Sequence, residues 1–308
     1  MEAFLAACVV AGTPLVLATV GELITEKSGS LNLGVEGLML MGAVMGFMAA
    51  YNTGNPILAV LCAGLAGAGG ALIFALVTVT LRANQTVTGL TLTIFGTGFA
   101  SFVGQPMIGF SVPGSVGAFF NKTSIPILGK IPVLGPIFFK QDIFVYFSYV
   151  IVILSCVYMY KTRLGLNMRA VGENAAAADA SGINVTLCKY VHILVGGALC
   201  GLGGAYLALI RVPIWQSDVV TGRGWIAVAL VIFASWNPVK ALLGAIFFGG
   251  LSILGLRLQA MGVAVSQYLV DMIPYVATVV IVIISSHKKK KENQPPADLG
   301  NNYFREER

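Results

Sequence analysis

Few side chains in this sequence have the types and spacing that acid, base or metal chemistry needs. Charged residues make up 10% of the 308 positions, and the two histidines, His192 and His287, have no cluster of carboxylates beside them. The five cysteines show no CxxC spacing, which argues against a structural zinc site or a disulfide framework. An enzyme needs a convergent set of acid, base, nucleophile or metal ligands. The sequence therefore predicts a protein that is not an enzyme and has no metal site.

A phosphate-binding loop is not recognisable either. The nearest approach to the pattern GxxxxGK[ST] is the run Gly117 to Thr123, which lacks the glycine before Lys122. That glycine belongs to the loop whose backbone amides cradle phosphates. We therefore predict no directly bound nucleotide and no other directly bound cofactor.

Several acidic residues lie at the edges of apolar segments. They are Glu22, Glu26, Glu36, Asp218 and Asp271. Ion-coupled transporters and proton pumps usually keep ionisable residues inside their membrane spans. The placement argues against such coupling, although a secondary transporter or channel remains a rival interpretation.

The elements that would carry any site are apolar segments, because 57% of the residues are hydrophobic. A membrane-spanning helix needs roughly 20 mostly apolar residues. We find about nine candidates: 4–21, 35–51, 57–81, 88–104, 143–160, 190–210, 222–236, 240–257 and 269–286. The composition predicts an all-α, polytopic integral membrane protein with one transmembrane domain at 1–286 and a polar tail at 287–308. Glycines four apart, such as Gly42 with Gly46 and Gly197 with Gly201, predict close helix packing.

Positive charge indicates the orientation. Four lysines, 288 to 291, directly follow the last apolar segment. The positive-inside rule places them, and the tail, in the cytoplasm. Nine spans then put the N-terminus outside. We expect the tail to be disordered. The net charge of +6 does not imply that the protein binds nucleic acid. The preference of cytoplasmic loops for lysine and arginine also produces a positive net charge.

Three polar segments interrupt the apolar pattern. The first, Gly21 to Gly37, carries Asn32 and Glu36, which would share one face of a helix. The alternative for this segment is an ordinary loop. The second, within a cytoplasmic loop, contains an N-cap at Asn174, an alanine run and a stop at Gly182. This pattern predicts a helix of about two turns, which is too short to be stable unless it docks on something.

The third segment is a short apolar stretch that begins with Gly222-Arg223-Gly224 and ends with Asn237-Pro238. This pattern is typical of a discontinuous helix, whose exposed backbone lines transport pathways. A tight turn outside the membrane is an equally good interpretation.

Together these segments resemble the permeases of branched-chain amino acid and simple-sugar ABC importers. The resemblance is strongest to the shorter permease of nucleoside importers. It rests on Gly21 to Gly37, Asn84 to Gly89, Met168 to Gly182 and Gly222 to Pro238, which occur in the family's order, and it covers about residues 10 to 285.

The resemblance implies a plasma-membrane permease subunit with several partners. These are a cytoplasmic ABC ATPase that hydrolyses ATP, a second permease subunit, an extracellular substrate-binding lipoprotein and membrane lipid. It also implies that Met168 to Gly182 forms a coupling helix inserted into the ATPase. The residues expected at its start are Arg169, Gly172, Glu173 and Asn174.

The substrate pathway is a weaker expectation that rests on polarity beside apolar spans. Its candidate residues are Asn32, Glu36, Asn84, Gln85, Thr88 and Trp225. By the same resemblance the substrate is expected to be a nucleoside, with simple sugars and branched-chain amino acids as alternatives.

Overall fold

The computed structural model describes residues 2–126, 128–260 and 294–305, with isolated positions between 269 and 283. The longer helices are α1 (Glu2–Lys27), α2 (Val35–Thr53), α3 (Pro56–Ala75), α4 (Gln85–Gly104), α7 (Ile143–Lys161), α10 (Val185–Tyr206) and α12 (Pro238–Ala260). The shorter ones are α5 (Gly114–Phe119), α6 (Leu134–Phe138), α8 (Arg163–Glu173), α9 (Ala175–Ala180) and α11 (Arg223–Phe233). The π-helical turns η1 (Leu76–Thr80) and η4 (Leu207–Arg211) continue α3 and α10.

The described residues contain seven helices that are long and apolar enough to cross a membrane. The predicted segments from 4–21 to 240–257 each fall on a helix, which confirms a polytopic, mostly helical protein. The segment predicted at 222–236 is α11, a helix of 11 residues. The segment predicted at 269–286 lies largely outside the described residues.

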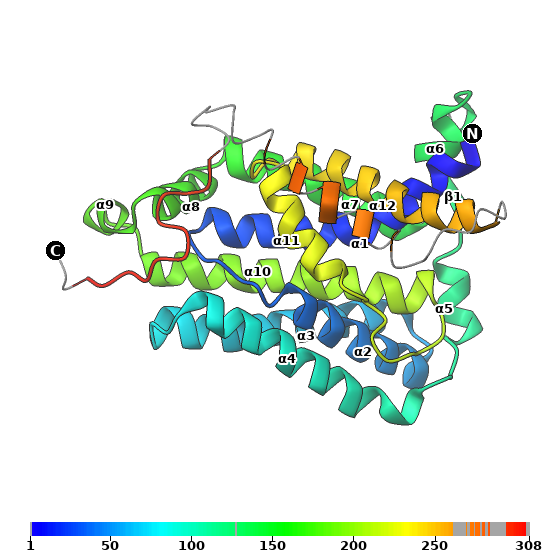
Figure 1. Cartoon of the computed structure of the whole chain (residues 1–308), viewed down its shortest axis with the longest axis horizontal. Helices are drawn as coiled ribbons and strands as arrows, with labels where there is room; N and C mark the ends of the chain where they lie inside the picture. Colours follow the sequence, from blue (N-terminus) through cyan, green and yellow to red (C-terminus); the bar gives the residue numbers. More distant parts are fainter. Residues whose placement is uncertain are drawn as a thin grey trace.

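Three helices form the centre of the bundle (Figure 1). In their apolar stretches α1, α2 and α10 bury 61%, 78% and 72% of the residues, against 28% to 39% for α3, α4, α7 and α12. The outer helices turn large apolar side chains outward, among them Leu65, Ile94 and Ile153. A surface of this kind suits lipid as the surrounding solvent.

Glycines bring the central helices together. A Cβ atom at Gly42 of α2 would overlap the backbone of Gly201 in α10, and one at Gly197 of α10 would overlap Ala71 in α3. A Cβ at Gly46 would lie 3.0 Å from the Ala63 side chain of α3, which is closer than ordinary packing. The predicted close packing at these glycines is confirmed, and it joins α2, α3 and α10 backbone to backbone.

The two ends of the bundle differ (Figure 1). The N-terminus lies at one end, together with α5, α6 and a short antiparallel pair, β1 (Thr123–Ser124) and β2 (Lys140–Gln141). Helices α8 and α9 lie at the opposite end, together with residues 294–305. We call this second end the α8–α9 end.

Replacing Gly42 by leucine should destabilise the fold, because the side chain has no space between α2 and α10. Overpacking of this kind costs about 1–3 kcal/mol. We expect a lower melting temperature for the purified membrane protein. Gly98→Leu on α4 is the matched control, since Gly98 is exposed and a Cβ there meets nothing within 4 Å. Equal melting temperatures for Gly42→Leu and the wild type would contradict the packing described.

Candidate functional site

Glu36 lies one residue into α2 and binds the start of α11. Its Oε1 accepts from the Gly222 amide at 2.8 Å and its Oε2 accepts from the Gly224 amide at 2.6 Å. No side chain at position 222 caps α11, so a carboxylate from another helix satisfies its first amides. A negative charge there also complements the helix dipole.

Glycine is required on both sides of this contact. Gly222 has a φ of +79°, in the left-handed region that glycine adopts readily. A Cβ at Gly224 would overlap the backbone of Glu36. The pattern Gly-Arg-Gly thus lets the chain turn and then lets α11 begin against α2.

A second carboxylate holds the other end of α11. The Trp236 indole donates its Nε1–H to Glu26 Oε2 at 2.6 Å. The Lys27 ammonium lies 5.8 Å from the centre of the same ring. The turn of residues 234 to 237 therefore packs onto the end of α1, and Pro238 starts α12 directly afterwards.

The chain before α11 is not helical, and its backbone pairs with another loop. Trp215 N donates to Phe110 O at 2.9 Å, and Val112 N donates to Pro213 O at 2.9 Å. Trp215 itself is 2% exposed. The stretch 212–222 is therefore an ordered, partly buried connection from the end of η4 to α11.

The first polar segment forms a tight turn between α1 and α2. Asn32 N donates to Glu22 Oε1 at 3.0 Å, and Asn32 Oδ1 accepts from Gly34 N at 2.9 Å. Leu31 N donates to Gln85 Oε1 at 2.7 Å. Because Asn32 precedes α2, it does not share a helical face with Glu36. Its amide and the Gln85 amide both satisfy the backbone of this turn.

The other predicted pathway residues lie in two separate places. Asn84 caps α4 by accepting from Val87 N at 2.9 Å, and the Thr88 hydroxyl donates to Asn84 O at 2.8 Å. Both are at the α8–α9 end. Trp225 is half-buried in the first turn of α11, beside the Glu36 contact. The structure thus places Trp225 next to a glycine that Glu36 binds, and it separately places Asn32, Asn84, Gln85 and Thr88 around the turn after α1 and the start of α4.

The helix predicted after Asn174 is present. Asn174 Oδ1 accepts from Ala177 N at 2.8 Å and caps α9, a helix of six residues. Gly182 follows with a φ of +84°, so the predicted cap and stop are confirmed.

Helix α8, which precedes α9, was not predicted. It contains three of the four residues expected to couple to an ATPase. Gly172 packs so closely on Lys27 O that a Cβ atom would overlap it, and the Arg169 guanidinium lies 5.5 Å from the centre of the Tyr160 ring. Glu173 is exposed at its last position. Arg169 and Gly172 therefore anchor α8 to the bundle, while Glu173 faces outward.

Part of the tail contradicts the expectation of disorder. Residues 294–305 pack on the α8–α9 end. Asp298 Oδ2 accepts from Ala175 N at 2.7 Å, and Asp298 N donates to Gly172 O at 3.0 Å. The Asp298 carboxylate therefore helps to cap α9. Leu299 and Tyr303, apolar residues within a polar tail, were the available signal for this docking.

The same segment holds the other end of α9. Asp179 accepts from the Tyr303 hydroxyl at 2.9 Å and pairs with Arg305 at 3.1 Å. Asn302 Nδ2 donates to Arg82 O at 2.6 Å, and Gln85 Nε2 donates to Asn302 Oδ1 at 3.2 Å. Residues 298–305 thus link both ends of α9 to the start of α4.

No group of metal-ligating side chains is found among the described residues. His192 Nε2 shares a 2.7 Å hydrogen bond with the Tyr158 hydroxyl, and its Nδ1 lies 2.6 Å from Cys188 O. His192 is therefore a packed, hydrogen-bonded residue, and it is 5% exposed.

Comparison with known proteins identifies the family of this chain. Residues 4–284 match the family described as branched-chain amino acid transport system / permease component. The chain is 36% identical to the guanosine ABC transporter permease protein NupQ of Bacillus subtilis, over 89% of each chain. It is 32% identical to the nucleoside ABC transporter permease protein NupC of Lactococcus lactis, over 91% of each.

A third relative is named for a different substrate. The putative glucose ABC transporter permease protein TsgC13 of Haloferax volcanii is 39% identical over 84% of this chain and 79% of its own. No solved structure matches the chain. With this family match and these relatives, the chain belongs to the branched-chain amino acid transport system permease family, and it is a multi-pass permease subunit of an ABC importer rather than an enzyme.

Proposed function

We propose that this permease conducts nucleosides into the cell. The observation that carries the proposal is the similarity, over about nine-tenths of both chains, to two permeases named for guanosine and for nucleosides. Glucose is the second candidate, because the 39% identical relative is named for it. Branched-chain amino acids remain the third, on the family description.

We further propose that α11 and the stretch before it form a discontinuous crossing of the membrane beside the pathway. An 11-residue helix is about 16 Å long, roughly half of the 30 Å hydrocarbon thickness. Irregular backbone is tolerated at that depth where it is buried in protein or lines a wet cavity. Glu36 and Trp225 at the start of α11 would then lie near the middle of the membrane.

The outer face of α4 is the other surface that suits a conduit. It exposes Thr91, Thr97 and Ser101 among apolar side chains. The Thr91 and Thr97 hydroxyls each donate to a carbonyl of their own helix at 2.9 Å, which lowers the cost of removing them from water. A second permease subunit facing this surface would enclose a pathway that Asn84 and Thr88 reach at its α8–α9 end.

The coupling proposal places a cytoplasmic ABC ATPase against α8 and α9. Glu173 and Asn174 are exposed there, whereas Gly172 is held on α1. Movement of a docked ATPase would reach the bundle through this rigid contact. In this orientation the α8–α9 end is cytoplasmic, the N-terminus is outside, and an extracellular binding lipoprotein delivers substrate to the opposite end.

Uptake of radiolabelled substrate tests the substrate class. Cells that express the complete importer should accumulate guanosine or another nucleoside, and excess unlabelled glucose should not compete. A matched strain lacking this permease is the control. Uptake of glucose that is insensitive to excess nucleoside would assign the second candidate instead.

Trp225→Ala should reduce nucleoside uptake by roughly tenfold, equivalent to about 1.4 kcal/mol, because it removes the large side chain beside the Glu36 contact. Ile232→Ala is the matched control, since Ile232 lies on the exposed face of the same helix. Both variants should reach the membrane in wild-type amounts. Wild-type uptake by Trp225→Ala would remove Trp225 from the pathway.

Asp298→Ala should uncouple transport from ATP hydrolysis, because α9 loses a cap worth about 1 kcal/mol. We expect substrate-stimulated ATPase activity of the purified complex to fall several-fold while the subunits stay assembled. Asn301→Ala is the control, because Asn301 accepts from Gln85 Nε2 and from Lys189 Nζ through its backbone carbonyl and not through its side chain. Undiminished stimulation in Asp298→Ala would show that this cap has no part in coupling.

A further inference from the structure

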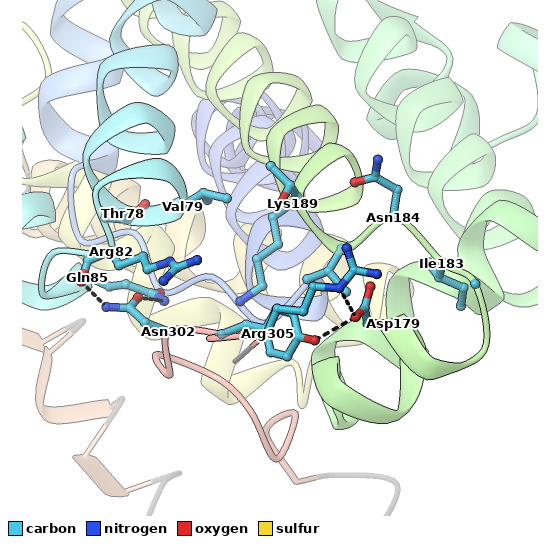
Figure 2. A pocket seen from close by; sticks show the side chains of 14 residues that line it. Thr78, Val79, Arg82, Gln85, Asp179, Ile183, Asn184, Lys189, Asn302 and Arg305 are labelled. Carbon is cyan, nitrogen blue, oxygen red and sulfur yellow. Dashed lines mark hydrogen bonds and ion pairs between the residues drawn. The ribbon is translucent and has the colours of Figure 1, made fainter. Parts of the chain in front are cut away.

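A cavity of about 500 Å³ lies at the α8–α9 end, between η1, the first turn of α10 and the C-terminal segment. Figure 2 shows three cations directed toward it: Arg82, which follows η1, Lys189 of α10 and Arg305 of the C-terminal segment. The lining residues include one carboxylate, Asp179, which is paired with Arg305 at 3.1 Å. The lining therefore carries a surplus of positive charge.

Lys189 is the most constrained of these cations. It is 4% exposed, and its ammonium donates to Asn301 O at 3.4 Å, which is a long distance for such a bond. An ammonium has three donors, and a buried charge needs pairing. The Asp298 carboxylate is near enough for its negative charge to act on the Lys189 ammonium. Its Oδ2, however, accepts a hydrogen bond from Ala175 N.

The start of α10 adds backbone donors to the same cavity. Asn184 caps this helix by accepting from Leu187 N at 2.9 Å. The amides of the first helical turn, at Val185 and Thr186, have no acceptor within the helix. Both residues line the cavity. Helix amides beside a buried ammonium and a guanidinium are a suitable environment for a phosphate group.

The surroundings favour a lipid as the source of that phosphate. Leu81, which precedes Arg82, is 72% exposed, and Leu187, two residues before Lys189, is 61% exposed. Leu76 and Val191, one helical turn deeper, are also exposed. These exposed apolar side chains, on η1, directly after it and at the start of α10, lie close to the cavity in sequence, and acyl chains of a bound lipid would pack against them.

We propose that this cavity binds the phosphate headgroup of an anionic phospholipid. Lys189 and Arg82 contact the phosphate, and the amides at the start of α10 complete the site. Arg305 forms its edge and remains paired with Asp179. Because the C-terminal segment is one wall of the cavity, the bound headgroup also links that segment to the membrane surface.

The test uses the purified full-length chain in neutral detergent, with phosphatidylglycerol, phosphatidylcholine or inorganic phosphate added separately. We expect phosphatidylglycerol to raise the melting temperature by roughly 3–6 °C at saturation, and to be retained in native mass spectra. Phosphatidylcholine and inorganic phosphate should leave the melting temperature unchanged. Equal stabilisation by both lipids would overturn the proposal, and stabilisation by inorganic phosphate alone would overturn the assignment to lipid.

Two variants locate the site. Arg82→Gln and Lys189→Met should each weaken phosphatidylglycerol binding by roughly tenfold. Arg82 is exposed, so its variant decides the question if Lys189→Met does not fold. Arg163→Gln is the matched control, since it removes an exposed cation from the first position of α8, outside the cavity lining. Equal binding by Arg82→Gln and Arg163→Gln would show that the lipid binds elsewhere.

Discussion

Two carboxylates from neighbouring helices hold the short helix α11 in place at its two ends. Glu36 accepts from the first amides of α11, and Glu26 accepts from the Trp236 indole in the turn that ends it. Since α1 and α2 supply these two groups, the position of the short helix depends on the pair of helices at the centre of the fold.

The central helices that hold α11 also pack closely on one another. Gly42 and Gly201 bring α2 and α10 into backbone contact, and Gly224 brings α11 equally close to Glu36. Without the hydrophobic effect to drive association between helices in lipid, close van der Waals packing and interhelical hydrogen bonds must hold them. A rigid centre of this kind leaves the outer helices free to face lipid or another subunit.

At the α8–α9 end, a short helix is stabilised by a segment that is distant in the sequence. Helix α9 has six residues and is too short to persist by itself. Asn174 and Asp298 together satisfy its first amides, while Tyr303 and Arg305 hold Asp179 near its end. A segment far away in the sequence therefore stabilises the helix that we assign to coupling. The same segment closes one side of the cationic cavity around Lys189.

The sequence by itself determined the membrane class, the first eight helical segments, and the cap and stop of α9. These features depend on local quantities, namely the length of an apolar run, the preference of Asn174 for an N-cap and the freedom of Gly182 to adopt a positive φ. Family resemblance added the permease assignment, which the relatives confirm. Local pattern could also show that Glu36 and Gly224 were unusual residues beside apolar segments.

Only the tertiary structure decided which partners these polar residues have. Glu36 and Gly224 are 188 positions apart, and Asp298 and Ala175 are 123 apart. Asn32 and Gln85, which polarity alone suggested for a pathway, have amide groups that satisfy the turn after α1. The polar composition of the tail predicts disorder, whereas residues 294–305 are held by hydrogen bonds to distant backbone groups. Such pairings have no local signature, since any buried amide or carbonyl requires a partner and the sequence does not say which one reaches it.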